Sequence, residues 1–311
     1  MRHSVVSIIT GWGEDLGVGH IQRMASLADF LNRKKYARAF LISHEKPEFL
    51  PSSIYDYISP EIEPGTTCII RDIRDSNMDD MLNLKKNHKV IVVDDCGPGR
   101  NIADLAIDLL PNLKYANHKK ELFIHGYNFT DSIRRLDGRH IAKTIDCAIY
   151  CGINPSRETV AFYLSLIPHH STCAILSGNN SLLFKDGELS SLLKSHAEIL
   201  LSSIMLISHF GITLYEGYIA GCRLLSINPT EYHSQLSDIA TKEIGVINLG
   251  ISSTIKIDQA RSNISDIMQN PILDRINPAI VLEKIERGLE EFHSRIRPFL
   301  NDEPLISKKK K

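Results

Sequence analysis

Short apolar runs separated by stretches of helical periodicity recur along the whole chain, and this alternation constrains the fold most strongly. The clearest run is Val90–Val93, which is apolar throughout and is followed at once by Asp94 and Asp95. Strands of this kind are buried on both faces, which is typical of parallel strands covered by helices. The alternation predicts an α/β fold with parallel sheets and helices on both faces. Further strands are expected at 5–9, 39–42, 68–70, 106–112, 148–152, 172–176, 204–208, 224–227 and 246–250.

The strand–helix alternation occurs in two successive series. A chain of 311 residues is long enough for two domains. A polar stretch at 113–143 with few periodic apolar residues is expected to connect them. We therefore predict Rossmann-like domains at 1–140 and 141–300, a basic tail at 301–311, and a C-terminal helix that packs back on the first domain.

Composition excludes several classes of protein. With 43% hydrophobic and 23% charged residues, the chain can bury a sizeable core. A net charge of -1 argues against a nucleic-acid partner. No apolar stretch is long enough to insert into a membrane, and the run at 5–9 is too short for a signal peptide, so we expect a cytoplasmic protein. The oligomeric state does not follow from the sequence.

No metal-binding or cofactor motif is present. The six cysteines are scattered, and Cys147 and Cys151 are about four strand rises apart, too far to share one ion unaided. Paired-cysteine zinc motifs and calcium loops are absent, and Asp94-Asp95 is not a convincing metal pair. We therefore expect neither a metal ion nor a cofactor.

A glycine-rich turn joins the first strand to the first helix. It contains Gly11, Gly13, Gly17 and Gly19, and His20 follows in the first helical turn. Glycines let the backbone approach a ligand, and free N–H groups at a helix start favour an anion. The helix dipole also disfavours imidazolium, which suits a histidine that acts as a general base. The alternative is that His20 is a loop or capping residue. The dinucleotide fingerprint does not fit, because its third glycine would fall on a leucine.

Acidic residues follow two other strands of the first half. Asp72 ends the run at 68–70, and Asp94 and Asp95 end the next one. Ligands of parallel sheets lie beyond the carboxyl ends of the strands, so these carboxylates and His20 are expected at one edge. The alternative is that Asp94 and Asp95 initiate a turn or cap a helix.

Three strand ends in the second half carry small or polar residues before helices. They are Gly152-Ile153-Asn154, Gly211-Ile212-Thr213 and residues 231–235. The turn at 211–213 offers amides and a hydroxyl to a phosphate, and Glu216 one helical turn later would accept hydrogen bonds from ribose hydroxyls. The alternative for Thr213 is a simple helix cap.

Taken together, these segments resemble the UDP-2,4-diacetamido-2,4,6-trideoxy-β-L-altropyranose hydrolase family of pseudaminic acid biosynthesis. Residues 17–23 resemble its G-x-G-H-x-x-R element, 151–155 its G-G-S-D-P turn, 211–216 its G-S-T-x-W-E, 234–235 its N-Q pair and 248–250 its N-L-G. The likeness also extends to spore-coat polysaccharide biosynthesis-like proteins. It covers about residues 4–295 and implies the glycosyltransferase-B fold, with the nucleotide mostly on the second domain.

The resemblance also implies roles for individual residues. His20 would deprotonate the attacking water, and no metal or cofactor is implied. Departures such as Phe210 before Gly211, and Asn154 and Ser234 in place of an acid and an amide, leave the sugar open. The residues implied to bind substrate or nucleotide are Gly17, Gly19, Arg23, Asp95, Gly152, Asn154, Gly211, Ile212, Thr213, Glu216, Ser234 and Gln235.

The sequence-based function is hydrolysis of a UDP-activated amino or deoxy sugar, with release of UDP. The alternative is a metal-independent glycosyltransferase that uses a nucleotide-sugar donor. An apolar or basic membrane-facing patch, common on such transferases, is not evident in the first half, which favours the hydrolase. A further alternative is a non-catalytic protein that binds sugar nucleotides.

Overall fold

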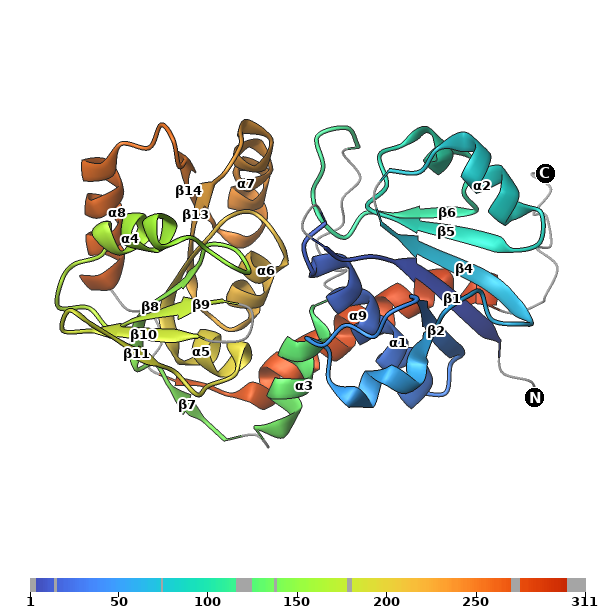
Figure 1. Ribbon diagram of the computed structural model, residues 1–311, viewed down its shortest axis with the longest axis horizontal. Helices are drawn as coiled ribbons and strands as arrows, with labels where there is room; N and C mark the ends of the chain where they lie inside the picture. Colours follow the sequence, from blue (N-terminus) through green and yellow to red (C-terminus); the bar gives the residue numbers. More distant parts are fainter. Residues whose placement is uncertain are drawn as a thin grey trace, which may run out of the picture. The chain divides into compact units, whose positions relative to one another are not determined.

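The computed structural model describes residues 4–13, 16–73, 75–115, 125–136, 139–177, 181–269 and 275–300, and they form two compact α/β units (Figure 1). The first unit contains the chain up to Tyr127 and from Glu286 onward, and the second contains Asn128–Ile285. The division into domains at residue 140 stays a prediction. The expected tail at 301–311 lies outside the described residues. Within the described part, no helix is both long and apolar enough to cross a membrane.

The first unit is built on a six-stranded sheet in which every strand pair is parallel. Its order is β3-β2-β1-β4-β5-β6, the order of the Rossmann fold. The elements are β1 (Val5–Thr10), α1 (Gly19–Arg33), β2 (Arg38–Ile42), a 3-10 helix (Ser52–Tyr57), β3 (Ile58–Ser59), β4 (Thr66–Asp72), α2 (Met78–Lys85), β5 (Lys89–Val93), a second 3-10 helix (Pro98–Ile102) and β6 (Leu105–Ile107).

Helices cover both faces of this sheet. Met81 of α2 packs with Val90 and Val92 on one face. The periodic apolar residues of α1, such as Ile21 and Leu31, are buried, and α1 contacts β1 and β2. The strand expected at 106–112 ends at Ile107, because Asp94 accepts the N–H groups of the residues that would extend its ladder.

The C-terminal part of α9 (Pro278–Leu300) belongs to the first unit from Glu286 onward. Arg33 Nη2 donates to Glu286 Oε1 at 2.6 Å, and the rings of Tyr36 and His293 stack with centroids 3.8 Å apart. The final helix therefore packs on the end of α1, as the sequence analysis expects.

The second unit contains a seven-stranded sheet of order β11-β10-β9-β8-β12-β13-β14. Strands β8, β9, β12, β13 and β14 pair in parallel, whereas β10 and β11 add an antiparallel hairpin. The elements are α3 (Tyr127–Arg135), β7 (Ile141–Ala142), β8 (Ile145–Tyr150), α4 (Arg157–Ser165), β9 (Cys173–Leu176), β10 (Leu182–Lys185), β11 (Glu188–Ser191), α5 (His196–Ser202), β12 (Ser203–Ser208), α6 (Ile212–Ile219), β13 (Arg223–Asn228), α7 (Glu231–Ile244), β14 (Ile247–Ile251), α8 (Ile257–Gln269) and β15 (Arg275–Ile276), which pairs with β7.

Helices also cover both faces of the second sheet. Tyr163 of α4 and Ile264 of α8 pack with Met205 on one face. On the other face α6 lies close to the strands, since a Cβ on Gly217 would come within 2.4 Å of Leu206 Cδ2. Together the two units confirm the predicted α/β architecture of parallel sheets covered on both faces.

Each sheet has one point at which the direction of strand addition reverses, the topological switch point. In the first unit the chain runs from β1 outward to β2 and β3, then returns to β4 beside β1 and continues the other way. In the second unit β8 and β12 are the corresponding neighbours. The loops that leave two such strands diverge and open a crevice at the carboxyl edge. The topology therefore places a candidate ligand site after β1 and β4, and another after β8 and β12.

The loop after β5 is held by close backbone packing, which a single methyl group would disturb. A Cβ on Gly97 would lie 2.3 Å from the carbonyl oxygen of Ser76, which is a backbone atom and cannot rotate away. We expect Gly97→Ala to lower the free energy of unfolding by about 1–3 kcal/mol, measured by urea denaturation. Asn101→Ala, at an exposed position of the same segment, is the control and should change it by less than about 0.5 kcal/mol. Equal stabilities would show that the loop relaxes freely.

Candidate functional site

The glycine-rich turn after β1 is closed by its own backbone. Gly17 N donates to Gly13 O at 2.7 Å, and Gly13 N donates to Gly17 O at 3.2 Å. Gly17 has φ +66°, a left-handed conformation that favours glycine. Helix α1 begins two residues later at Gly19 without a side-chain cap. This arrangement places His20 in the first turn of α1, beside Asp72 at the end of β4.

His20 forms a hydrogen-bonded pair with Asp72, the last residue of β4. The distance from His20 Nδ1 to Asp72 Oδ1 is 2.8 Å. Burial alone would raise the pKa of Asp72, but the Arg23 guanidinium and the hydrogen bond from His20 outweigh it and lower that pKa. An ionised carboxylate only accepts hydrogen bonds, so Nδ1 of His20 carries a proton and donates it to Asp72. The His20 side chain is 26% exposed, whereas Asp72 is fully buried.

Arg23 joins this pair to a second carboxylate. Its Nε donates to Asp72 Oδ2 and its Nη1 donates to Asp94 Oδ2, both at 2.6 Å. Burial would lower the pKa of Arg23, but the charges of Asp72 and Asp94 raise it above its ordinary value. Arg23 was expected to contact substrate. Its observed hydrogen bonds are to carboxylates of the same unit, and its Nη2 lies 3.3 Å from His20 Nδ1, so its contacts fit a positioning residue.

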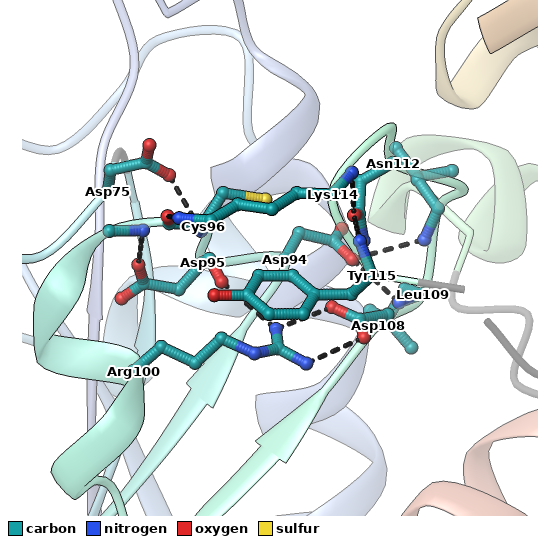
Figure 2. A network of polar contacts seen from close by, with 12 residues as sticks. Asp75, Asp94, Asp95, Cys96, Arg100, Asp108, Leu109, Asn112, Lys114 and Tyr115 are labelled. Atoms are coloured by element: carbon teal, nitrogen blue, oxygen red, sulfur yellow. Dashed lines mark hydrogen bonds and ion pairs between the residues drawn. The ribbon is translucent and has the colours of Figure 1, made fainter. Parts of the chain in front are cut away.

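Asp94 is fixed in turn by the loop that follows β6. Its Oδ1 accepts the N–H groups of Leu109 at 2.6 Å and Leu110 at 3.1 Å, and its backbone has φ +49°. Figure 2 shows the surrounding network, in which the ring of Tyr115 lies over the guanidinium of Arg100 at 4.1 Å. Arg100 also donates to both carboxylate oxygens of Asp108, at 2.7 and 2.8 Å. This layer ties the 94–115 loop together around Asp94.

Asp95, also expected to contact substrate, is fully buried. Its Oδ1 accepts the N–H groups of Ser76 at 3.0 Å and Gly97 at 2.8 Å, and Arg71 lies 3.4 Å from Oδ2. Of the four residues expected at this edge, His20, Asp72 and Asp94 therefore meet around Arg23. Asp95 instead joins the loop after β5 to the segment before α2.

The turn between β12 and α6 forms the centre of the candidate site in the second unit. Helix α6 begins after Gly211 without a side-chain cap. Phe210 N donates to Asn228 Oδ1 at 2.9 Å, and the buried Asn228 also bonds Ser237 of α7 and Asn248 of β14. These bonds fix the start of α6 against the two neighbouring strand–helix units.

A group of rings lies at the same edge. The ring centroids of Tyr150 and His209 are 5.4 Å apart, and those of His209 and His233 are 6.5 Å apart. His209 Nδ1 lies 3.0 Å from the carbonyl oxygen of Phe210, which requires Nδ1 to donate. The pKa of His233 is lowered mainly by burial, and the neighbouring His209 adds to the effect. The ring contacts join the ends of β8 and β12 to the first turn of α7.

The remaining expected residues lie on the loops of this edge. Thr213 and Glu216 are buried in α6, and burial together with the charge of Glu216 raises the pKa of Tyr150 to about 12. Gly152 has φ +110° in the loop after β8, where Asn154 is exposed. Ser234 accepts two hydrogen bonds from Asn248 Nδ2, and Gln235 bonds Glu231 on the surface of α7. Neither His209 nor His233 was among the residues expected to bind a ligand, although His233 lies in the segment 231–235.

Comparison with known proteins yields matches in structure. Neither a family model nor a curated protein sequence matches the chain. The glycotransferase of kitacinnamycin superposes with a TM-score of 0.52 at 10% identity, covering 97% of this chain and 100% of that one. Arabidopsis thaliana UGT89C1, crystallised with quercetin, gives a TM-score of 0.54 at 10% identity, and its complex with UDP gives 0.50 at 9%. Both superpositions cover 95% of this chain and 100% of the other. The chain has the glycosyltransferase-B fold.

Among the described residues, no group of three or more histidine, cysteine or acidic side chains has the arrangement of a metal site.

Because Arg23 is buried between two carboxylates, we expect its substitution to lower the stability of the protein in a pH-dependent way. Arg23→Gln leaves Asp72 buried without its cation, so we expect the free energy of unfolding to fall by about 3–5 kcal/mol near neutral pH. Because the pKa of Asp72 is lower in the folded protein than in the unfolded chain, ionised Asp72 stabilises the folded protein at pH values above the ordinary carboxyl pKa. This contribution is lost as the pH falls through the pKa of Asp72 in the folded protein. In the variant the pKa of Asp72 rises, so the difference from wild type should shrink at about pH 5.

Urea denaturation at about pH 7.5 and about pH 5 measures this difference. Arg33→Gln, on the same helix with an exposed ion pair to Glu286, is the matched control and should cost at most about 1 kcal/mol. A loss in Arg23→Gln that is equal at both pH values would contradict an electrostatic role.

Proposed function

We propose that this protein transfers a sugar from a nucleotide sugar to a hydroxyl acceptor, with His20 as the general base. The observation that carries the proposal is the 2.8 Å bond from His20 Nδ1 to the buried Asp72. Because Nδ1 is held by that bond, Nε2 of the partly exposed ring is the nitrogen that would take a proton from an acceptor. The carboxylate of Asp72 would stabilise the imidazolium that forms. The glycosyltransferases that share the fold support transfer in preference to hydrolysis.

The charge balance around Arg23 supports proton uptake by His20. One guanidinium faces two carboxylates, Asp72 and Asp94, so this group carries one uncompensated negative charge. An imidazolium at His20 would neutralise it. In the proposed step Nε2 takes the proton of the acceptor hydroxyl as its oxygen bonds to the anomeric carbon. The bond from that carbon to the diphosphate breaks, and the nucleoside diphosphate leaves with the bonding electrons.

The nucleotide is assigned to the second unit. The uncapped start of α6 presents N–H groups of Ile212 and Thr213 that suit a diphosphate, and Glu216 would accept hydrogen bonds from the ribose. The leaving diphosphate gains negative charge as its bond to carbon breaks, so donors fixed there would favour departure. The UGT89C1 complex with UDP supports uridine diphosphate as the first nucleotide to test.

Hydrolysis of a UDP-sugar is the second candidate. The observation that favours it is the element at 17–23, whose G-x-G-H-x-x-R pattern resembles the hydrolase family named above. The His20–Asp72 pair can deprotonate water as readily as an alcohol, and bond making and breaking would otherwise be the same. A protein that only binds sugar nucleotides is the third outcome.

One experiment separates the three functions. The purified protein is incubated with a panel of UDP-sugars, with and without hydroxyl acceptors that include quercetin, the compound named in the UGT89C1 complex. Acceptor-dependent release of UDP with a glycosylated product supports the transferase. Release of UDP and free sugar at the same rate without acceptor supports the hydrolase. Binding of a UDP-sugar in calorimetry without release of UDP supports a protein that only binds sugar nucleotides.

The role of His20 predicts a separation of catalysis from binding. We expect His20→Asn to bind UDP as wild type does but to lower turnover by roughly 10²–10⁴-fold, the usual contribution of a positioned base. Asp72→Asn should also lower turnover, since the ring loses the negative charge that would stabilise the imidazolium, and an amide can also present a donor to Nδ1. His44→Asn, an exposed histidine of the same unit, is the control. Normal turnover by His20→Asn excludes the mechanism. If water is the acceptor, label from oxygen-18 water must appear in the sugar and not in UDP.

The role of Glu216 is tested by nucleotide binding alone. We expect Glu216→Gln to weaken UDP binding by about 10–100-fold in calorimetry, because a buried carboxylate that accepts from a ribose hydroxyl makes charge-assisted hydrogen bonds. The loss should be smaller for 2′-deoxy-UDP, which lacks one of the two hydroxyls. Glu188→Gln, on the exposed strand β11, is the matched control. Unchanged UDP affinity in Glu216→Gln would place the ribose elsewhere.

A further inference from the structure

The second sheet has a pocket at its amino edge, opposite to the edge with the candidate nucleotide residues. Its volume is about 390 Å³. The pocket lies where the neighbouring parallel strands β12, β13 and β14 begin and where α6 and α7 end. We call it the amino-edge pocket, and the lining residues that matter below are Lys143, Ile204, Tyr218, Arg223, Leu224 and Ile267.

The lining of the amino-edge pocket is mainly apolar with two cations. Isoleucine and leucine side chains from β12, β13 and α8 form much of its wall. Lys143 and Arg223 add positive charge, and none of the described lining residues is acidic. Pockets of a few hundred Å³ with an apolar wall and a few polar groups are typical of sites for small molecules.

The two cations differ in what they already bind. Lys143 Nζ lies 2.8 Å from Ala220 O, 3.4 Å from Leu200 O and 4.0 Å from Cys222 Sγ. Its three protons therefore have acceptors at the ends of α5 and α6. Burial lowers the pKa of Lys143, the effect expected for an ammonium without a counter-charge, although the Cys222 thiol opposes the shift.

The Nε atom of Arg223, the first residue of β13, differs from Lys143 Nζ in lacking an acceptor among the described residues. This atom is buried, and it has no hydrogen-bond partner within the described part of the chain. A buried N–H group without an acceptor costs free energy, and an anion that accepts from it recovers that cost with a charge-assisted bond. Arg223 lines the amino-edge pocket together with a second cation, and none of the described lining residues is acidic.

We propose that the amino-edge pocket binds a small carboxylate with an apolar tail. The carboxylate accepts from Arg223 and lies in the field of Lys143, while the tail packs against Ile204, Leu224 and Ile267. A carboxylate would supply the acceptor that Arg223 Nε lacks within the described chain, and the apolar wall suits an apolar tail better than a strongly hydrated anion such as free phosphate. The site is separate from the nucleotide residues because it occupies the other edge of the sheet.

Calorimetric titration of the whole protein with octanoate and with 1-octanol tests the proposal without any substitution. The two probes share an eight-carbon chain and differ in charge. We expect octanoate to bind at one site at least about tenfold more tightly than 1-octanol. Equal affinity of the two probes, or no octanoate binding at millimolar concentration, would overturn the proposal. Octanoate binding should also be unchanged in saturating UDP, and displacement by UDP would assign the probe to the nucleotide site instead.

A variant then assigns the binding to Arg223. Arg223→Gln, checked for native secondary structure by circular dichroism, should weaken octanoate binding by about 10–100-fold and leave 1-octanol binding unchanged. Lys185→Gln, at an exposed position of β10 three strands away from β12, is the matched control and should bind octanoate as wild type does. Wild-type octanoate affinity in a folded Arg223→Gln protein would refute the role of the arginine.

Discussion

The arrangement of the first unit depends on one buried guanidinium shared by two carboxylates. Arg23 lies in α1, Asp72 ends β4 and Asp94 follows β5, so three elements distant in sequence meet at its planar fork. Burying these charges singly would be costly, and only their mutual pairing makes the burial tolerable. The pairing constrains the orientation of α1 on the sheet to the geometry that satisfies both acids. The same geometry brings His20, one turn earlier on α1, within 2.8 Å of Asp72.

The same arrangement of charges suits the role of general base that we propose for His20. If Arg23 paired with Asp72 alone, the pair would be neutral. The second acid, Asp94, leaves the group one negative charge in excess, and its own pKa is raised by burial and by Asp72 despite the attraction of Arg23. Backbone N–H groups of Leu109 and Leu110 hold Asp94 in place. The loop network around Arg100 and Tyr115 thus helps to hold Asp94, and with it the charge balance beside His20.

The sequence predicts most of the fold and the gathering of acids at one edge, because both follow from strand periodicity and the geometry of parallel sheets. Helix α3 was missed inside the expected connection at 113–143, and the exposed hairpin β10–β11 has little apolar alternation to reveal it. The direction in which each side chain points is harder to predict from the sequence. Arg23 is three residues after His20, a spacing that places both on one helix face, but whether it faces a substrate or an acid depends on the register of β4. Asp95 is next to Asp94 and bonds different groups, because consecutive residues diverge where a strand ends.

The second unit shows how the two edges of one parallel sheet take opposite chemistry. Strands begin where the preceding helices end, so the amino edge collects helix C-termini, whose carbonyl groups attract cations. Lys143 fits this rule, since its acceptors are the carbonyls of Leu200 and Ala220 near the ends of α5 and α6. Arg223 does not, because its buried Nε has no acceptor within the described chain. At the carboxyl edge the N-terminus of α6 instead presents donors. We propose a nucleoside diphosphate for the carboxyl edge and a carboxylate for the amino edge, where the buried Arg223 Nε lacks an acceptor within the described chain.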